Sequence, residues 1–367
     1  MTDLTLKTWL SIQERPARAG DRARLAAVTV CGLAVLLMLV CLLSLTTGAS
    51  GSSGWAVIES WFGLVDKSDP AVLREQVIIY DIRLPRMVLG ILIGAGLAVS
   101  GVVMQGLFRN PLADPGLVGV SAGAGLGAVV IIVLGATIAA PLVALLGIYT
   151  LPLSAFGGGL VTTLILYRVS TARGQTAVAT MLLAGIAIGA LAGAITGVLV
   201  YLANDQQLRD LTFWGLGSLA GATWVKVTAA GPIIAIAVAS TLFLAGGLNA
   251  LTLGEATANH LGVPVQRFKN IAIAAVAAAV GASVAVSGGI GFVGIVVPHL
   301  LRLVIGPDHR FLLPASALLG ASFLLGADAI SRVIVAPAEL PIGIVTASVG
   351  GPFFLWILLR RRDRLAW

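Results

Sequence analysis

Charged residues are scarce in this chain. Only 11% of its 367 residues are Asp, Glu, Lys or Arg, and three are His, whereas soluble domains carry about a quarter charged residues. This composition excludes a soluble domain of useful size. Cysteine is also rare, because Cys31 and Cys41 are the only two. Both fall in one apolar stretch, which favours two small hydrophobic side chains over a disulfide or a metal site.

The motifs of common enzyme classes are missing as well. There is no His-Glu-x-x-His pair, and the three histidines, His260, His299 and His309, lie near expected loops. No Lys follows a Gly anywhere, so the chain has no Gly-x-x-x-x-Gly-Lys phosphate loop and cannot bind ATP in that way. We therefore expect a protein that is not an enzyme, with no metal site and no cofactor of its own.

Long apolar runs are what the chain does contain. Hydrophobic residues make up 58% of it, and residues 116–167 include no Asp, Glu, Lys, Arg or His. A helix needs roughly 20 apolar residues to cross a hydrocarbon layer of about 30 Å. The sequence therefore predicts an all-α polytopic membrane bundle of about ten spans. They are expected near 25–46, 87–108, 116–136, 142–167, 177–203, 227–250, 270–287, 292–306, 311–333 and 340–359.

The basic residues indicate the orientation of these spans. An even number of spans places sixteen of the Lys and Arg residues on the side of both termini and seven on the other side. The positive-inside rule assigns the richer side to the cytoplasm. We therefore expect a cytoplasmic tail over 1–24, one transmembrane domain over 25–359 and a second cytoplasmic tail over 360–367. The net charge of +7 follows from these loops and tails and does not indicate nucleic-acid binding.

Small residues recur at regular spacing. Gly185, Gly189, Gly193 and Gly197 stand four residues apart, which is typical of close helix packing in membranes.

Two segments of the chain resemble each other, since residues 94–101 match residues 281–288 at six of eight positions. The match arises either by chance in an Ala- and Gly-rich chain or from an inverted repeat of the kind that transporters use.

The expected inner loop at about 251–264 has the pattern of a short helix. Thr252 and Glu255 have the spacing of a capping box, Gly262 provides a left-handed stop and Pro264 prevents continuation. This pattern predicts a compact helix on the cytoplasmic face. Such a helix is either a solvated connector or a docking element for a soluble partner.

Ionisable residues inside the spans are few. Asp328 is the only acidic residue well inside an expected span, and Arg332 follows it by four residues. Such a pair is either a structural ion pair near the outer end of its helix or a proton site of an ion-coupled transporter. Arg83, Arg86 and Arg332 lie at the outer side, where basic residues are disfavoured. Each therefore has either a local partner or an external one.

Several long motifs resemble one known family. The segments Arg83–Arg86 and Gly101–Gly116 are similar to those of permeases of type II ABC importers, which carry iron–siderophores, haem or vitamin B12. The resemblance continues in the same order over about residues 80–358. The other segments that are similar to this family are Gly254–Pro264, Gly289–Gly294, Pro298-His299, Asp308–Arg310 and Ala338–Gly343.

The resemblance implies ten helices per subunit, a homodimer with the pathway on its axis, two cytoplasmic ATPase subunits and a periplasmic binding protein. ATP and Mg would then bind to the partner ATPase and not to this chain. The resemblance also implies roles for particular residues. They are Arg83, Arg86 and Arg332 for binding-protein docking; Gly254, Glu255, Ala258, His260, Leu261 and Gly262 for ATPase coupling; and Asn110 and Leu112 for a cytoplasmic gate.

The sequence thus predicts a permease subunit in the inner membrane that moves haem or a ferric siderophore to the cytoplasm, with cobalamin as the third choice. The alternative is a secondary transporter driven by an ion gradient. The scarcity of carboxylates within the spans argues against that alternative, because ion-coupled transporters keep such groups at mid-membrane. No set of residues in the sequence selects haem over the other cargoes.

Overall fold

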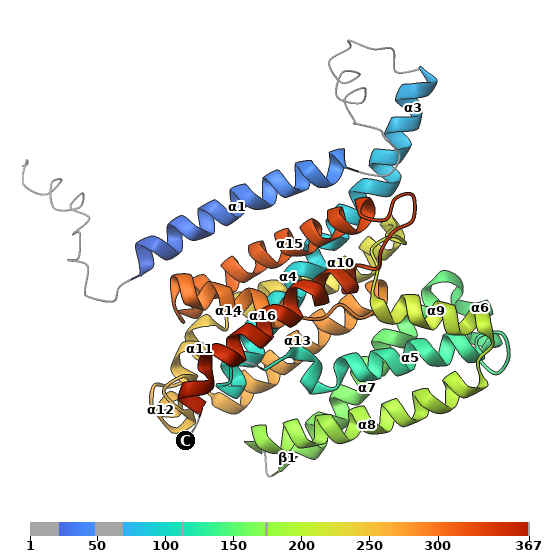
Figure 1. Ribbon diagram of the computed structural model, residues 1–367. Coiled ribbons are helices and arrows are strands. Elements are labelled where there is room, and N and C mark those ends of the chain that lie inside the picture. The colour runs from blue at the N-terminus through green and yellow to red at the C-terminus, as the bar shows by residue number, and fades with distance from the viewer. Residues whose placement is uncertain (1–21, 48–68, 112, 173–174, 366–367) are drawn as a thin grey trace, which may run out of the picture.

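The computed structural model describes residues 22–47, 69–111, 113–172 and 175–365, and its elements are almost all helices (Figure 1). Two strands of two residues each, β1 (Thr171–Ala172) and β2 (Gln175–Thr176), form a hairpin. The helices are α1 (Ala23–Thr46), α3 (Pro70–Val77), the π-helix η1 (Ile78–Arg83), α4 (Leu84–Phe108), the 3-10 helix η2 (Pro115–Val118), α5 (Val120–Leu134), α6 (Ala140–Leu146), the 3-10 helix η3 (Gly147–Tyr149), α7 (Thr150–Ser170), α8 (Val178–Leu202), α9 (Asp205–Leu216), α10 (Trp224–Leu242), α11 (Ala245–Leu251), α12 (Glu255–His260), α13 (Val265–Ser287), α14 (Val293–Ile305), α15 (His309–Val333) and α16 (Ile342–Leu365).

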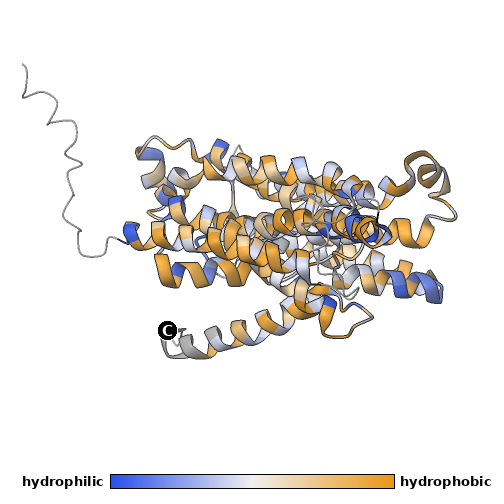
Figure 2. Ribbon diagram, turned by 90° about the horizontal axis from the view of Figure 1, so that it is seen from above, coloured by the Kyte–Doolittle hydropathy of each residue, from blue (hydrophilic) through white to orange (hydrophobic). Residues whose placement is uncertain are grey.

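The expected membrane bundle is confirmed. Among the described residues, seven helical segments are long and apolar enough to cross a membrane. Three shorter apolar helices, α5, α14 and the apolar part of α16, lie where three further spans are expected. Hydrophobic residues predominate along the helices, and the most hydrophilic residues lie mainly towards the two ends of the bundle (Figure 2). This distribution fits a hydrocarbon layer between two aqueous faces.

Helices α4, α13 and α15 form the centre of the bundle, whereas α1 and α8 lie at its edges (Figure 1). Two glycines of α4 allow the close packing. A Cβ on Gly94 would stand 2.4 Å from the Gly320 carbonyl oxygen of α15, and one on Gly101 would overlap the Gly294 oxygen of α14. Small residues let the backbones touch, so van der Waals contact holds helices that gain little from hydrophobic burial in lipid.

Residues 94–101 and 281–288, the two segments with matching sequences, lie at α4 and α13, which run in opposite directions. Helix α4 starts beside Leu45 of α1 and ends near Gly254, whereas α13 starts near α12 and ends with Ser287 beside Ser218. The opposite directions are those that an inverted repeat requires. Their sequence similarity alone still does not separate a repeat from chance.

Several boundaries differ from the sequence-based ones. The expected span at 142–167 lies within one apolar helical segment, Ala140–Ser170, which is divided into α6, η3 and α7 because Gly147, with φ +53°, ends α6. Helix α9 was not anticipated, since its alternating polar and apolar residues do not form a hydrophobic run. Helix α16 continues to Leu365, so residues 360–365 of the expected cytoplasmic tail are helical.

Helices α1 and α16 show how the chain ends are placed. The start of α1, the end of α16 and α12 all lie at one end of the bundle, and α3 and α9 lie at the other (Figure 1). We call the end with α12 the inner end and the end with α3 the outer end. The arrangement agrees with an even number of crossings.

Candidate functional site

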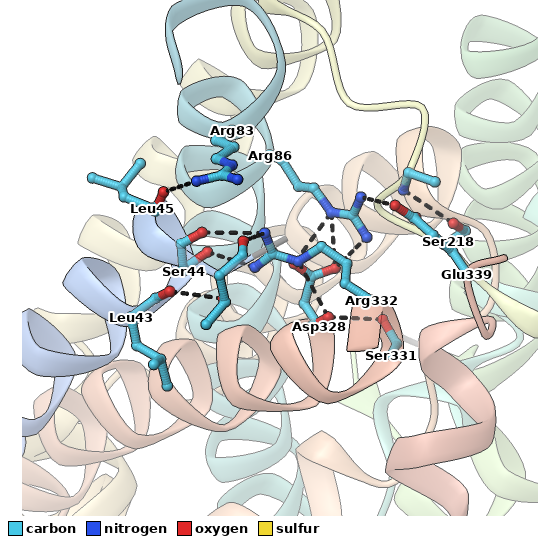
Figure 3. Close-up of polar contacts among 12 residues, drawn as sticks. Leu43, Ser44, Leu45, Arg83, Arg86, Ser218, Asp328, Ser331, Arg332 and Glu339 are labelled. Carbon is cyan, nitrogen blue, oxygen red and sulfur yellow. Dashed lines mark hydrogen bonds and ion pairs between the residues drawn. The ribbon is translucent and has the colours of Figure 1, made fainter. Parts of the chain in front are cut away.

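The outer end contains a buried cluster of charges formed by Arg86, Asp328, Arg332 and Glu339 (Figure 3). The Arg86 guanidinium donates to the Asp328 carboxylate from Nε at 3.0 Å and from Nη2 at 2.8 Å, and its Nη1 donates to Glu339 at 2.9 Å. Arg332 Nε lies 3.1 Å from the second Asp328 oxygen. Asp328 is fully buried. A planar guanidinium that binds a carboxylate through two nitrogens gives a rigid tie, here between α4 and α15.

Two of the arginines also hold the end of α1. Arg332 donates from Nη1 to the Ser44 and Thr47 carbonyl oxygens, at 3.1 and 2.9 Å, and from Nη2 to the Ser44 hydroxyl. Arg83 donates to the carbonyl oxygen of Leu45 (Figure 3). The last carbonyls of a helix lack intrahelical partners and carry partial negative charge. Cations at this position therefore satisfy and stabilise the C-terminus of α1.

The π-helix η1 places Arg83 at this position. The wide turn precedes Pro85, which has no N–H, so the carbonyl oxygen of Tyr80 has no backbone donor five residues later. The indole Nε1 of Trp224 donates to that oxygen at 2.8 Å. A side chain from α10 thus replaces the missing backbone bond and stabilises the turn that leads into α4.

Arg83, Arg86 and Arg332, the residues expected to dock the binding protein, are buried in this conformation, and their docking role stays a prediction. Their exposed fractions are 4%, 5% and 4%. The physical reason is the cluster itself, since Asp328, Glu339 and the end of α1 already engage the three guanidinium groups. The alternative of a local Asp328–Arg332 pair is confirmed.

At the inner end, α12 forms the predicted short helix. Gly254 at φ +101° and Gly262 at φ +85° bound it, so the expected left-handed stop at Gly262 is confirmed. The predicted capping box is wrong. The Thr252 hydroxyl donates to the Asn249 carbonyl oxygen at 2.6 Å, and no side chain caps the helix. Glu255 instead pairs with Lys269 of α13 at 2.8 Å, which ties α12 to the bundle.

The residues expected to couple to an ATPase divide into two groups. Ala258 is fully buried, so it faces the bundle and is unavailable to a partner, contrary to expectation. His260, Leu261 and Gly262 are exposed, and Gly254 and Glu255 are partly exposed. Leu253, which the sequence did not single out, is 64% exposed, and Leu261 is 62% exposed. These two leucines flank α12 and give it an apolar outer surface.

The turn after α4 is a Schellman motif. Arg109 adopts φ +49°, its N–H bonds the Gly106 oxygen, and the Asn110 N–H bonds the Gln105 oxygen. Asn110 is exposed at this turn. Leu112, the second expected gate residue, lies outside the described residues. The turn therefore presents Asn110 at the inner face, and its partner in the expected gate stays a prediction.

A cavity of about 340 Å³ lies between the start of η2 and the segment Gly289–Gly294 that leads into α14. Gly116 lines it from the side of η2, and Gly291 and Phe292 line it from the other side. Asp114 also lines it, and its carboxylate accepts a 2.7 Å hydrogen bond from the Gly116 N–H. Burial raises the pKa of Asp114, and the bond from Gly116 opposes this shift. The sequence did not single out Asp114, since it lies between two spans.

Three of the four regularly spaced glycines of α8 have open space beside them among the described residues. Hypothetical Cβ atoms on Gly189, Gly193 and Gly197 would meet nothing within 4 Å. These glycines therefore do not mediate packing inside this bundle. Most of α8 presents an apolar, largely exposed surface, which includes Leu183 and Leu191.

Comparisons with known proteins agree with this architecture. The model of the FecCD transport family matches residues 36–360. The hemin transport system permease protein HmuU of Yersinia pestis is 49% identical over 284 residues, which are 77% of this chain and 84% of that protein. The cobalamin import system permease protein BtuC of Halobacterium salinarum is 45% identical over 289 residues, 79% of this chain and 75% of that protein.

A solved structure of a metal-chelate type ABC transporter in an inward-facing conformation has the same fold. It superposes with a TM-score of 0.77 and 32% sequence identity, over 90% of this chain and 98% of that chain.

Proposed function

The chain belongs to the FecCD transport family and is a permease subunit of an ABC importer; on that premise, we propose that it moves haem or a ferric siderophore from the periplasm to the cytoplasm. Membership in this family excludes the secondary transporter driven by an ion gradient. In ABC importers of this family, ATP hydrolysis takes place in a partner subunit. Haem is our first choice of cargo, since the 49% identical relative is a hemin permease, and cobalamin is the third.

The observation that carries the ATP-driven mechanism is α12. It projects at the inner end between two exposed leucines, while Ala258 and the Glu255–Lys269 ion pair hold it against the bundle. A short element that is fixed on one side and apolar on the other fits the role of a docking surface for a soluble partner. We infer that two cytoplasmic ATPase subunits bind here, one for each permease copy, and that they carry the ATP and Mg.

The proposed homodimer is supported by α8. Gly189, Gly193 and Gly197 meet no other helix among the described residues, and small residues at regular spacing allow two helices to approach closely in lipid. A second copy of this chain would bury the apolar face of α8. The pathway would then lie between the two copies, with Asn110 and Leu112 near its cytoplasmic end.

The proposed gate has a direct test. Apolar constrictions hold back solutes by excluding water. Shortening Leu112 to Ala is therefore expected to let liposomes that contain the permease leak small solutes without ATP. A leak equal to that of the wild type would remove Leu112 from the gate.

The orientation also follows from the charge distribution. The inner end holds both described chain ends and α12, and the flanking sequence on that side carries sixteen of the 23 basic residues. We propose that both termini face the cytoplasm and that the permease lies in the inner membrane.

We propose that a periplasmic binding protein docks at the outer end by competing for Arg86. Glu339 is the exposed edge of the charge cluster, with 35% of its side chain accessible, whereas Asp328 is sealed. A carboxylate of the binding protein would replace Glu339 on the Arg86 guanidinium. Glu339→Gln is therefore expected to speed capture of the loaded binding protein at low salt, because a neutral amide competes less strongly. Slower capture would contradict this mode of docking.

The transport function itself is tested by uptake into proteoliposomes that contain the permease and its ATPase. We expect ATP-dependent accumulation of haem, inhibition by vanadate and no effect of a proton uncoupler. Accumulation of cobalamin but not haem would overturn the choice of cargo and leave the ATP-driven mechanism intact. Uptake abolished by the uncoupler would overturn the mechanism.

A further inference from the structure

A second polar cluster lies at the inner end, where α4, α11, α14 and α15 meet. It borders a cavity of about 280 Å³, far larger than the roughly 30 Å³ of one water molecule. Its lining combines two arginines, a histidine and several small or polar residues. These are Gln105, Gly106, Arg109, Pro111, Thr252, Arg302, Pro307 and His309.

The charges around this cavity are not balanced. None of the lining residues is acidic, and within the described part of the chain neither Arg109 nor Arg302 forms an ion pair. Among the described residues, Arg302 makes one side-chain hydrogen bond, to the Gln105 amide oxygen. The Asp308 carboxylate, which precedes His309 in the chain, is occupied by the Asn249 amide at 2.7 Å and by the Arg310 N–H at 3.0 Å. Two guanidinium groups therefore border the cavity with most of their donors unused.

The hydrogen bonds around His309 assign its protons. The Asn249 amide nitrogen donates to Asp308, so the Asn249 oxygen must face His309. That oxygen accepts from the His309 backbone N–H at 3.0 Å and lies 2.7 Å from its Nδ1. An oxygen that only accepts requires a proton on Nδ1. In the neutral ring, Nε2 therefore carries a lone pair.

Among the residues that the structure describes, none forms a hydrogen bond with Nε2 of His309, although the residue has an exposed fraction of only 2%. It lies close to Gly106, where a Cβ would stand 3.1 Å away, and both residues line the cavity. A buried polar atom without a partner costs free energy unless a ligand completes it. The cavity thus offers one acceptor next to two cationic donors.

From this arrangement we propose that the cavity binds inorganic phosphate in its monohydrogen form. The anionic oxygens accept from Arg109 and Arg302, and the remaining P–OH donates to His309 Nε2. Arginine is well suited to phosphate because its planar donors match two oxygens at once. A phospholipid headgroup offers the same anionic oxygens, but its phosphodiester has no P–OH for the histidine.

The site adjoins the docking surface of the inner end. Arg109 lies near the start of α12, with one guanidinium nitrogen 4.0 Å from where a Cβ of Gly254 would stand, and Thr252 lines the cavity. A bound phosphate would therefore contact the segment that precedes α12. The proposal does not depend on the identity of the cargo.

The test is calorimetric titration of the full-length permease with sodium phosphate, in nanodiscs made only of phosphatidylcholine. Arg302→Gln is expected to weaken phosphate binding at least about tenfold, since it removes a charged hydrogen bond. Arg302→Lys keeps the charge and should retain most of the affinity, which separates loss of the ligand from misfolding. Arg267→Gln, an exposed inner-end arginine on α13, is the matched control and should change binding less than about twofold.

Two further titrations identify the ligand. Sulfate has the same shape without a proton at neutral pH, so it should bind several-fold more weakly than phosphate if His309 Nε2 accepts a hydrogen bond. Nanodiscs with phosphatidylglycerol should leave phosphate binding unchanged. Unaltered binding by Arg302→Gln, or no binding by the wild type, would overturn the site. Equal binding of sulfate would overturn the assignment of the P–OH, and competition by phosphatidylglycerol would identify a lipid headgroup as the ligand instead.

Discussion

The two ends of this permease use charge in different ways. At the outer end, Arg86, Asp328 and Arg332 are buried together and tie α1, α4 and α15. At the inner end, one partly exposed pair, Glu255 with Lys269, holds α12, while apolar side chains and Arg109 stay exposed. Buried pairs fix a structure because their rupture leaves charges without solvent, whereas exposed groups are free to bind partners. The buried charges of the outer end therefore form a structural brace that leaves Glu339 as its exposed edge, whereas the inner end presents α12 as an exposed binding surface.

The largest effect is expected from Asp328→Asn. It leaves Arg86 and Arg332 buried without a full countercharge, which should cost about 3–5 kcal/mol of folding free energy. Thermal unfolding of the purified permease in detergent measures the loss of folding free energy. Glu339→Gln is the matched control in the same cluster, because Glu339 is partly exposed. Equal stability of the Asp328 variant and the control would contradict the brace.

A smaller effect is expected from Glu255→Gln at the inner end. The Lys269 side chain is buried but that of Glu255 is 42% exposed, so the lost pair should cost only about 1 kcal/mol. The same unfolding measurement applies. Association of the ATPase should weaken as well, since α12 loses its tie to α13. A loss of stability as large as that of Asp328→Asn would remove the difference between the two ends.

The smallest effect on stability is expected from the double change Leu253→Ser and Leu261→Ser. Both side chains are exposed, so folding should change by no more than about 0.5 kcal/mol per site. Co-purification of the ATPase should nevertheless fall markedly, because the apolar surface of α12 is lost. Normal co-purification would show that the ATPase binds elsewhere.

The membrane architecture and the local Asp328–Arg332 pair were predictable from the sequence, whereas side-chain partners distant in the sequence were not. Hydrophobic runs follow from the thickness of the bilayer, so the positions of most spans could be read directly. The role of Arg86 depends on Asp328, 242 residues away, and no local pattern reports such a contact. For the same reason Glu255 looked like a capping residue, although its partner is Lys269 on the next helix.

Glycine patterns were informative about helices but not about their neighbours. Gly101 and Gly193 both belong to small-residue patterns, yet Gly101 touches the backbone of α14 and Gly193 touches nothing in the chain. Which of them packs internally depends on the fold as a whole. The sequence also does not show what Ala258 contacts, because a small residue fits either against a partner protein or against the bundle. The fold buries Ala258 against the bundle.

The most direct test of the difference between the two ends is hydrogen exchange of the permease with and without its ATPase. The account predicts that amides of Glu255–His260 exchange at least about tenfold more slowly in the complex, as a docked helix opens less often. Amides around Arg86 and Asp328 should exchange slowly in both samples. Unchanged exchange in α12, or new protection confined to the outer end, would contradict the account.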